Sequence, residues 1–305
     1  MNRFLSVIIP TFRRRDSLAR LLDALLHQKD VLLEIIVVDQ NEGAYLNDII
    51  PVLPNIKHLK LDQPNVSSAR NEGFLNSSGE YILFIDDDLL PAGDFCAKGV
   101  DIFENYADIG SFSPLVYNAE GKENALQQTF LKRLEWFKGN GQIFSITDTI
   151  SAAIFFRKNY FSLTGGFDPM LFEFARTAED QEFFLRMRKK NMTLYYVPFI
   201  EIFHDEAVPG GCDLRSVDYW ISREKCIRSW AYRYRIHHNP PGRLFFWDML
   251  NLSRSVFLNR EVLSSGTESI KRQIGLMTKA IKSSDFFLRP RLKNYLPASS
   301  MNHLH

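Results

Sequence analysis

Three consecutive carboxylates are the residues of this sequence that most clearly suggest chemistry. Asp86, Asp87 and Asp88 follow directly on the apolar run Tyr81–Ile85. Adjacent carboxylates repel one another, and a hard divalent cation such as Mg²⁺ or Mn²⁺ offsets that repulsion. A diphosphate leaving group needs such a cation, because negative charge builds on the departing oxygen. The alternative is a plain acidic turn or a calcium loop, although the further ligands of an EF-hand are missing from the sequence.

Strands and helices are expected to alternate through the first ninety residues. The expected strands are Leu5–Pro10, Glu34–Val38, Ile56–Leu61 and Tyr81–Ile85, and the expected helices are Ser17–Gln28 and Ser68–Asn76. This alternation predicts an α/β fold with a doubly wound, mostly parallel, Rossmann-like sheet. Ligands of such sheets bind outside the carboxyl ends of the strands. Thr11, Asp39 and the three aspartates stand at such ends, so we expect them to meet at one edge.

The pattern after residue 90 is looser. We expect a strand at Ser151–Arg157, a turn at Gly165–Pro169 and a helix at Thr177–Lys190. A further strand, Leu194–Phe203, leads into His204. Beyond residue 218 the chain is expected to be helical, as a C-terminal extension.

Composition limits the class of protein. The 305 residues suit one large α/β domain with extra elements, or two packed lobes, and 45% hydrophobic residues can form a sizeable core. The net charge of +1 argues against a dedicated nucleic-acid binder. No run approaches the roughly 20 apolar residues of a membrane span, and the N-terminal apolar run is too short for a signal peptide. The three cysteines lack zinc-like spacing, which favours a reducing, cytoplasmic location.

Several motifs together resemble the family-2 inverting glycosyltransferases of the GT-A fold, such as bacterial sugar transferases of polysaccharide biosynthesis. They are SVIIPTFRR near the N-terminus, VVD at 37–39, NVSSARNEGFLNSSGEYILFIDDDLLP at 65–91, and GGFD…AEDQEFFLRM at 165–187. The resemblance covers roughly residues 4–205. It implies transfer of a sugar from a nucleotide-diphosphate donor to an acceptor hydroxyl, with Mn²⁺ or Mg²⁺ on the diphosphate.

The resemblance also implies a donor site. Donor contacts fall on Pro10, Thr11, Asp39, Arg70, Asp86 and Asp87, and metal contacts fall on Asp88 and His204. Asp39 matches the acid that hydrogen-bonds the base, commonly uracil, so UDP is favoured. Residues 40–43 (QNEG) depart from the Asp-Gly-Ser that often follows, which leaves base and ribose selectivity open. The alternatives are a structural histidine at 204, a turn cap at Asp39 and a surface ion pair at Arg70.

Asp180 matches the catalytic base of the family, with Glu179 as a candidate for acceptor contacts. Inversion is a single displacement, in which one base takes the proton of the attacking hydroxyl. The alternative is structural, because Thr177 to Asp180 also fits a helix N-cap followed by an acid at the third helical position. The two interpretations are compatible, and a helix N-terminus would keep the carboxylate ionised.

The resemblance divides the chain into a donor half (1–115), an acceptor half (116–215) and a C-terminal helical extension (216–305). The Gln-x-x-Arg-Trp motif of processive synthases is absent, so we expect transfer of one sugar to a glycan or lipid-linked saccharide. Loops at 118–141 and 206–213 are candidate acceptor contacts. Residues 220–260 combine arginines with aromatics, which suits peripheral contact with the inner face of a membrane, a helical core or a homodimer interface.

Other functions fit less well. A dehydrogenase would carry a G-x-G-x-x-G turn after its first strand, and a nucleotidyltransferase a glycine-rich loop there. A phosphatase would need Thr after its Asp-x-Asp, where this chain has Leu89 and Leu90. A non-catalytic relative that binds only glycan or nucleotide is the remaining alternative.

Overall fold

The computed structural model describes residues 3–118, 121, 142–205, 211, 219–237, 250 and 267–288. The chain forms two compact units. The first contains Met1–Phe167, Phe183–Cys212 and Asn294–His305, and the second contains Asp168–Glu182 and Asp213–Lys293. The predicted donor and acceptor halves are defined by the ligands they would bind, and the division into two units does not test this. The two halves stay a prediction.

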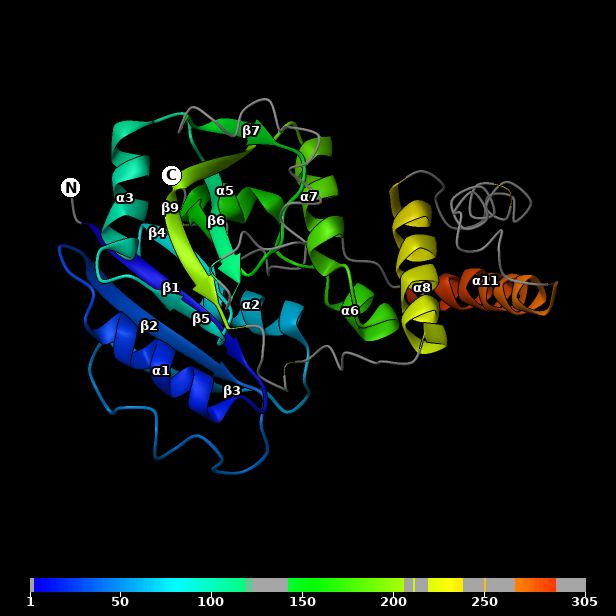
Figure 1. The fold of residues 1–305 in the computed structure, drawn as a ribbon, viewed down its shortest axis with the longest axis horizontal. Helices are drawn as coiled ribbons and strands as arrows, with labels where there is room; N and C mark the ends of the chain where they lie inside the picture. Colours follow the sequence, from blue (N-terminus) through cyan, green and yellow to red (C-terminus); the bar gives the residue numbers. More distant parts are fainter. Residues whose placement is uncertain are drawn as a thin grey trace. The chain divides into compact units, whose positions relative to one another are not determined.

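The described part of the first unit is built on one nine-stranded sheet (Figure 1). Its strands are β1 (Phe4–Thr11), β2 (Leu32–Asp39), β3 (Ile56–Lys60), β4 (Tyr81–Ile85), β5 (Leu89–Pro91), β6 (Ser111–Asn118), β7 (Phe144–Ile146), β8 (Ala153–Arg157) and β9 (Leu194–His204). The strand order is β3-β2-β1-β4-β8-β6-β9-β5, with β7 paired to β9. The first four strands are mutually parallel, and β8 joins them antiparallel. This confirms the predicted α/β class.

The parallel register brings strand ends together. Thr11 at the end of β1 pairs with Asp39 at the end of β2. Strand β4 lies on the other side of β1, and its end leads directly into Asp86. The expectation that these residues share one edge of the sheet therefore follows from the strand pairing itself.

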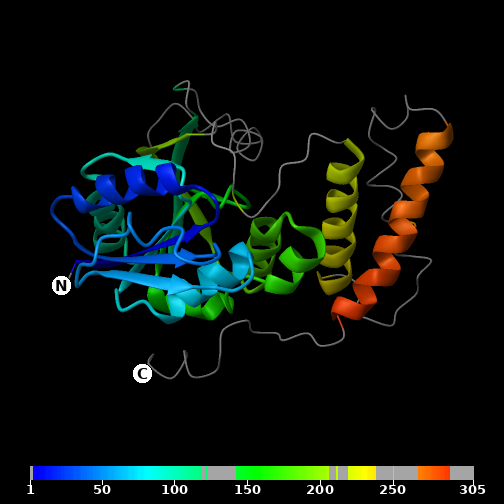
Figure 2. The same ribbon diagram turned by 90° about the horizontal axis from the view of Figure 1, so that it is seen from below.

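Helices cover both faces of this sheet. Those with residues in the first unit are α1 (Arg15–Leu26), α2 (Val66–Leu75), α3 (Phe95–Asn105), α5 (Lys158–Thr164) and most of α7 (Glu179–Lys189). Figure 2 shows α1 and α2 on opposite sides of the strands. Period-two alternation in β1 explains this, because Val7 and Ile9 pack toward α1 and α3 whereas Ile8 packs toward α2. Full burial of each such side chain contributes roughly 1.5–3 kcal/mol.

Several elements were not expected from the sequence. Helix α3 and strands β5, β6 and β7 lie where the hydrophobic pattern was too short or too polar to assign. The predicted helix at Thr177–Lys190 begins instead at Glu179, because Ala178 has φ 64° and interrupts helical geometry. The predicted turn at Gly165–Pro169 does contain left-handed backbone, with φ 87° at Gly165 and 81° at Gly166.

The second unit is helical in its described residues. It contains α6 (Pro169–Ala175), α8 (Tyr219–His237) and α11 (Thr267–Leu288). Helices α8 and α11 lie side by side and share an apolar cluster that includes Ile227, Met277 and Ile281. This helical structure agrees with the predicted C-terminal extension. None of the described helices is long and apolar enough to cross a bilayer.

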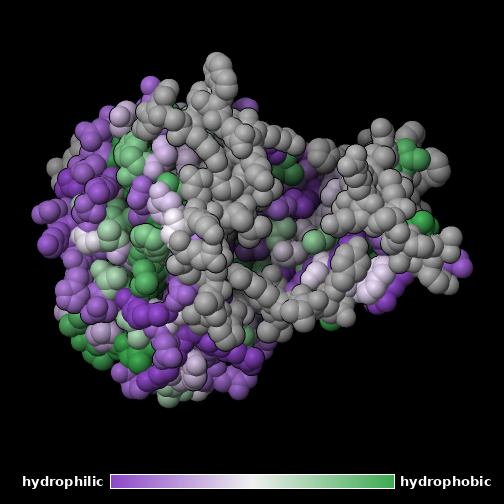
Figure 3. All heavy atoms as spheres, viewed as in Figure 1, coloured by the Kyte–Doolittle hydropathy of each residue, from purple (hydrophilic) through white to green (hydrophobic). Residues whose placement is uncertain are grey.

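Hydrophilic residues cover most of the coloured surface of the first unit on the face shown in Figure 3. Some large apolar side chains of the described residues also reach the surface, including Phe199 and Phe203 on β9. Because these two alternate with buried neighbours along the strand, they mark its outward face.

Candidate functional site

The three aspartates form the turn between β4 and β5. The Asp86 N–H donates to the Ala152 carbonyl (2.8 Å), and the Asp205 N–H donates to the Asp88 carbonyl (2.9 Å). His204 lies directly opposite Leu89 in the β5–β9 pair. Backbone hydrogen bonds from two other segments therefore fix the turn, and they bring the end of β9 to it.

Arg14 holds two of these carboxylates. Its Nη1 lies 3.0 Å from Asp87 Oδ1 and 2.6 Å from Asp88 Oδ2. Thr11 Oγ1 donates to the second oxygen of Asp87 across 2.7 Å. The side chains of both aspartates are buried, so this charge-assisted network lies in a region that screens charge weakly.

Asp88 also faces His204. Their closest atoms, Asp88 Oδ1 and His204 Nε2, are 3.2 Å apart. Burial alone would raise the pKa of Asp88, but His204 and Arg14 outweigh that effect and hold it below its ordinary value. Asp88 is therefore ionised at neutral pH.

The other two carboxyls respond differently to burial. Desolvation raises the pKa of Asp86, and the nearby charge of Arg70 offsets this only in part. Desolvation also raises the pKa of Asp87 to about 7, against the lowering effect of Arg14. Burial therefore works against full ionisation of the turn.

Asp39 is fully buried, and both of its carboxylate oxygens already have partners. Lys60 Nζ lies 2.9 Å from its Oδ2, and His58 Nε2 lies 3.0 Å from the same oxygen. Asn41 donates to Oδ1 from both its backbone and its side chain, each at 2.8 Å. Burial alone would raise the pKa of Asp39, but these hydrogen bonds together lower it. In this structure Asp39 thus organises the loop after β2.

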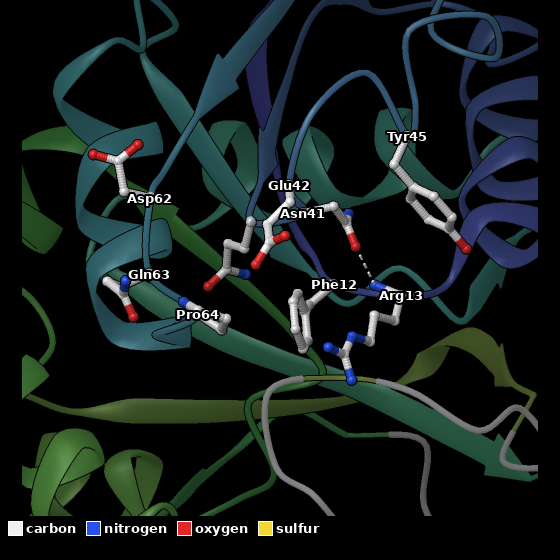
Figure 4. Close-up of a pocket in the computed structure, with 9 residues that line it drawn as sticks. Phe12, Arg13, Asn41, Glu42, Tyr45, Asp62, Gln63 and Pro64 are labelled. Atoms are coloured by element: carbon white, nitrogen blue, oxygen red, sulfur yellow. Dashed lines mark hydrogen bonds between the residues drawn. The ribbon is translucent and has the colours of Figure 1, made fainter.

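A cavity of about 510 Å³ opens beside that loop. Its lining residues are Phe12, Arg13, Gln40, Asn41, Glu42, Tyr45, Asp62, Gln63 and Pro64. Figure 4 shows the Phe12 ring in the middle of this group, and the Arg13 N–H donates to Asn41 Oδ1 (2.8 Å). The volume is within the range of small-molecule pockets. Pro10 is in β1, just before this lining, and Asp39 precedes Gln40.

Residues 6–163, just over half of the chain, match the model of glycosyl transferase family 2. The chain belongs to glycosyl transferase family 2. This confirms the family that the sequence motifs indicated.

Individual relatives match this chain over only part of their own length. Poly(ribitol-phosphate) beta-N-acetylglucosaminyltransferase TarP of Staphylococcus aureus is 29% identical over 210 residues, which are 63% of this chain and 62% of TarP. Glycosyltransferase GlyA of Streptococcus pneumoniae is 32% identical over 88 residues, 28% of this chain and 13% of GlyA. The match therefore spans less than two thirds of either relative.

A solved structure shares the fold. The crystal structure of S. aureus TarS 1–349 in complex with UDP-GlcNAc superposes with a TM-score of 0.61 and 16% identity. The alignment covers 95% of this chain and 85% of the TarS chain. The likeness confirms the expected GT-A type fold.

The carboxylate turn of this family-2 chain fits a divalent metal through two side chains. Asp88 Oδ1 is buried and accepts no hydrogen bond within the described residues, and His204 Nε2 faces it. In the part of the chain that the structure describes, no group of three or more His, Cys, Asp or Glu could hold a metal by itself. Mg²⁺ usually takes one or two carboxylates and completes its coordination with water and substrate phosphates. The donor set therefore suits an ion that binds together with a diphosphate.

Asp180 and Glu179 belong to the second unit. They are the first two residues of α7, so the predicted cap at Thr177, with Asp180 at the third helical position, is wrong. Asp180 Oδ1 accepts from the Gln181 N–H (2.7 Å), and the side chain is partly exposed. Its place at a helix N-terminus favours the ionised form.

Sequence reasoning missed two charged residues of the first unit, Arg14 and Lys60. Arg14 is one of three consecutive arginines after β1, and the only signal for it in the sequence is that the aspartates need positive charge nearby. Which arginine turns inward depends on the backbone, since Arg13 has φ 58° and Arg15 begins α1. Lys60 reaches Asp39 because the two pair across β2 and β3, a register that local sequence does not reveal.

Proposed function

We propose that this chain transfers one sugar from a nucleoside-diphosphate donor to an acceptor hydroxyl, with inversion at the anomeric carbon. The observation that carries the proposal is the cavity at the ends of β1 and β2, in the same unit as the Asp86–Asp88 turn. A nucleoside in this cavity and a diphosphate at the turn match the two parts of such a donor. UDP is the favoured nucleotide, and the UDP-GlcNAc of the TarS complex makes N-acetylglucosamine the first sugar to test.

Each part of the donor has proposed contacts. Pro10 and Thr11 meet the nucleotide, Asp39 supports the base, and Asp86 faces the ribose with Arg70 beside it. Asp87 completes the donor contacts through the network that Thr11 and Arg14 form. Because the Asp39 oxygens already accept several hydrogen bonds, base recognition falls more on the residues that line the cavity.

Asp88 and His204 would hold the divalent metal. The metal supplies positive charge that stabilises the leaving diphosphate. The chain's own residues would hold the proposed metal ligand in place, because the buried Asp88 is ionised and lies between Arg14 and His204.

Asp180 is the proposed general base, and Glu179 a proposed acceptor contact. An ionised carboxylate in the first turn of a helix can accept the proton of the attacking hydroxyl. A single displacement then inverts the anomeric carbon, whereas retention would need a covalent intermediate and a second step.

The proposed acceptor is a glycan or a lipid-linked saccharide. TarP acts on poly(ribitol-phosphate), so a hydroxyl-rich phosphate polymer belongs among the acceptors to be tried. We also propose a cytoplasmic location, with residues 220–260 contacting the inner face of the membrane or a second copy. Of these, 238–249 and 251–260 lie outside the described residues, as do most residues of both candidate acceptor loops, 118–141 and 206–213.

Thermal stability with and without nucleotides tests the donor proposal. UDP, dTDP, GDP, CDP and NAD are each added with and without Mn²⁺. Binding to the folded state stabilises the protein by about 2.7 kcal/mol at a hundredfold excess over Kd. We expect a Mn²⁺-dependent shift with one nucleoside diphosphate, and the loss of that shift in Asp88→Ala. Glycan binding without any nucleotide shift would support the non-catalytic alternative.

A further inference from the structure

Arg14 touches the carboxylate that is assigned to the metal. Its guanidinium lies 2.6 Å from Asp88 Oδ2, while His204 lies 3.2 Å from Oδ1 of the same group. The Arg14 side chain is 10% exposed and that of Asp88 is 2% exposed. A fixed positive charge therefore already occupies one side of the proposed metal ligand.

We propose that Arg14 is a built-in counter-cation that competes with the divalent metal for Asp88. The inference rests on the proposed function, since it concerns the same metal site. A divalent ion and a guanidinium on one buried carboxylate repel each other strongly, because the surroundings screen charge poorly. A metal at Oδ1 would therefore weaken the Arg14 contact at Oδ2, and the cost of weakening that contact lowers the affinity for metal in the absence of donor.

The surroundings of Arg14 allow such an exchange. Asp87 also binds the guanidinium, at 3.0 Å, so Arg14 keeps one partner after it leaves Asp88. Thr11 donates to the other Asp87 oxygen at 2.7 Å and holds that carboxyl in place. Gly211 packs against the guanidinium, since a Cβ at this position would lie 3.2 Å from Arg14 Nη2. A side chain at position 211 would therefore crowd Arg14.

The adjacent Arg15 provides a matched control. It has the same charge and sits one residue away, but it pairs with the exposed Asp48 rather than with the aspartate turn. Removing its charge alters the general field around the site without touching Asp88. A difference between variants at positions 14 and 15 therefore reports the direct contact.

Mn²⁺ binding to the full chain, measured by the electron paramagnetic resonance signal of free Mn²⁺ without nucleotide, tests the inference. We expect Arg14→Gln to bind Mn²⁺ about tenfold more tightly than wild type, a change of about 1.4 kcal/mol. Arg15→Gln should match wild type, and Asp88→Asn should remove binding in either background. Equal or weaker binding by a folded Arg14→Gln variant would overturn the inference.

A second variant covers the case in which Arg14→Gln does not fold. Arg14→Lys retains one charge but lacks the fork that spans two carboxylates. We expect it to bind Mn²⁺ with intermediate affinity, and wild-type affinity or weaker would contradict the inference.

Nucleotide binding separates this inference from the proposed function. If nucleoside diphosphates stabilise the protein but the Arg14 variants show no gain in Mn²⁺ affinity, the donor proposal stands and the competition is disproved. If the gain appears but no nucleotide binds, the competition stands and the donor proposal fails.

Discussion

Arg70 Nη2 lies 2.9 Å from Asp86 Oδ1, and this ion pair joins helix α2 to the end of strand β4. The Arg70 side chain is only 2% exposed; it also donates to the Ser151 carbonyl (3.3 Å) and lies over the Phe167 ring. Arg70 is therefore a structural support for the first carboxylate of the turn as well as a proposed donor contact.

Arg70→Met should destabilise the protein. The substitution removes the guanidinium that donates to Asp86 and to the Ser151 carbonyl. We expect the free energy of unfolding to fall by about 1–3 kcal/mol, because Arg70 is buried whereas the Asp86 side chain is 30% exposed and can regain water. Urea denaturation measures this, with Arg20→Met as control. Arg20 pairs with Asp205 at the surface, so its loss should cost under about 1 kcal/mol. Equal effects of the two substitutions would refute the supporting role.

Asp180→Asn should separate binding from chemistry. If Asp180 is the general base, the amide cannot take the acceptor proton, and kcat should fall by about 10²–10⁴. Donor affinity, measured by nucleotide-dependent stabilisation, should stay unchanged. Glu179→Gln is the neighbouring control and should raise KM for the acceptor more than it lowers kcat. Near-normal turnover by Asp180→Asn would show that the base lies elsewhere.

Glu34 lies near the start of β2, away from the aspartate turn. It should make the free energy of unfolding depend on pH. It accepts from Ser6 Oγ (2.6 Å), from Ser78 N (2.8 Å) and from Ser78 Oγ (3.0 Å), and it pairs with Lys57. Burial would raise the pKa of Glu34, but these partners together lower it. The stabilisation is therefore complete above the unfolded-state pKa of about 4.3 and is lost as the pH falls through the lower folded-state value.

Glu34→Gln should accordingly flatten the acid limb of the stability profile. We expect the variant to be less stable by about 1–3 kcal/mol at pH 7 and to approach wild type below pH 3. Chemical denaturation between pH 7 and pH 3 gives the profile. Glu80→Gln, at an exposed position, should keep the wild-type slope. An unchanged slope in Glu34→Gln would mean that other carboxyls dominate the acid limb.

The sequence predicted those parts of the site that follow from strand order. Apolar runs located β1 and β4, and the rule that parallel strands end at one edge placed Thr11 near Asp87. His204 lies 3.2 Å from Asp88, while the metal role that the resemblance implied for both residues stays a prediction. By contrast, the inward turn of Arg14 depends on the backbone at Arg13, and no periodic pattern encodes it.

The features that the sequence did not predict depend mostly on pairing between distant parts of the chain. Asp39 was expected to hydrogen-bond a base, and that role stays a prediction. Its hydrogen bonds to Lys60 of β3 and to Asn41 of the loop after β2 were not expected, because the first depends on cross-strand register. Strands β6 and β7 are stabilised mainly by β8 and β9, which lie far along the chain. Propensity within a short window cannot report such partners.

Tyr232→Phe tests the core of the second unit. Tyr232 and Asp168 are both fully buried, and the Tyr232 hydroxyl donates to Asp168 Oδ2 across 2.9 Å. The other oxygen, Oδ1, caps helix α6 by accepting from Met170 N (2.9 Å) and Leu171 N (3.2 Å). Removing the hydroxyl leaves a buried carboxylate oxygen with one partner fewer, which should cost about 1.5–3 kcal/mol.

Asp168→Ala should cost more than Tyr232→Phe, because it also removes the helix cap, which is itself worth about 0.5–2 kcal/mol. Thermal unfolding of both variants gives the comparison, with Tyr106→Phe, at an exposed position, as the control that should be neutral. If Tyr232→Phe is as neutral as the control, the hydroxyl–carboxylate bond does not stabilise this unit. If Asp168→Ala costs no more than Tyr232→Phe, the cap contributes nothing beyond that bond.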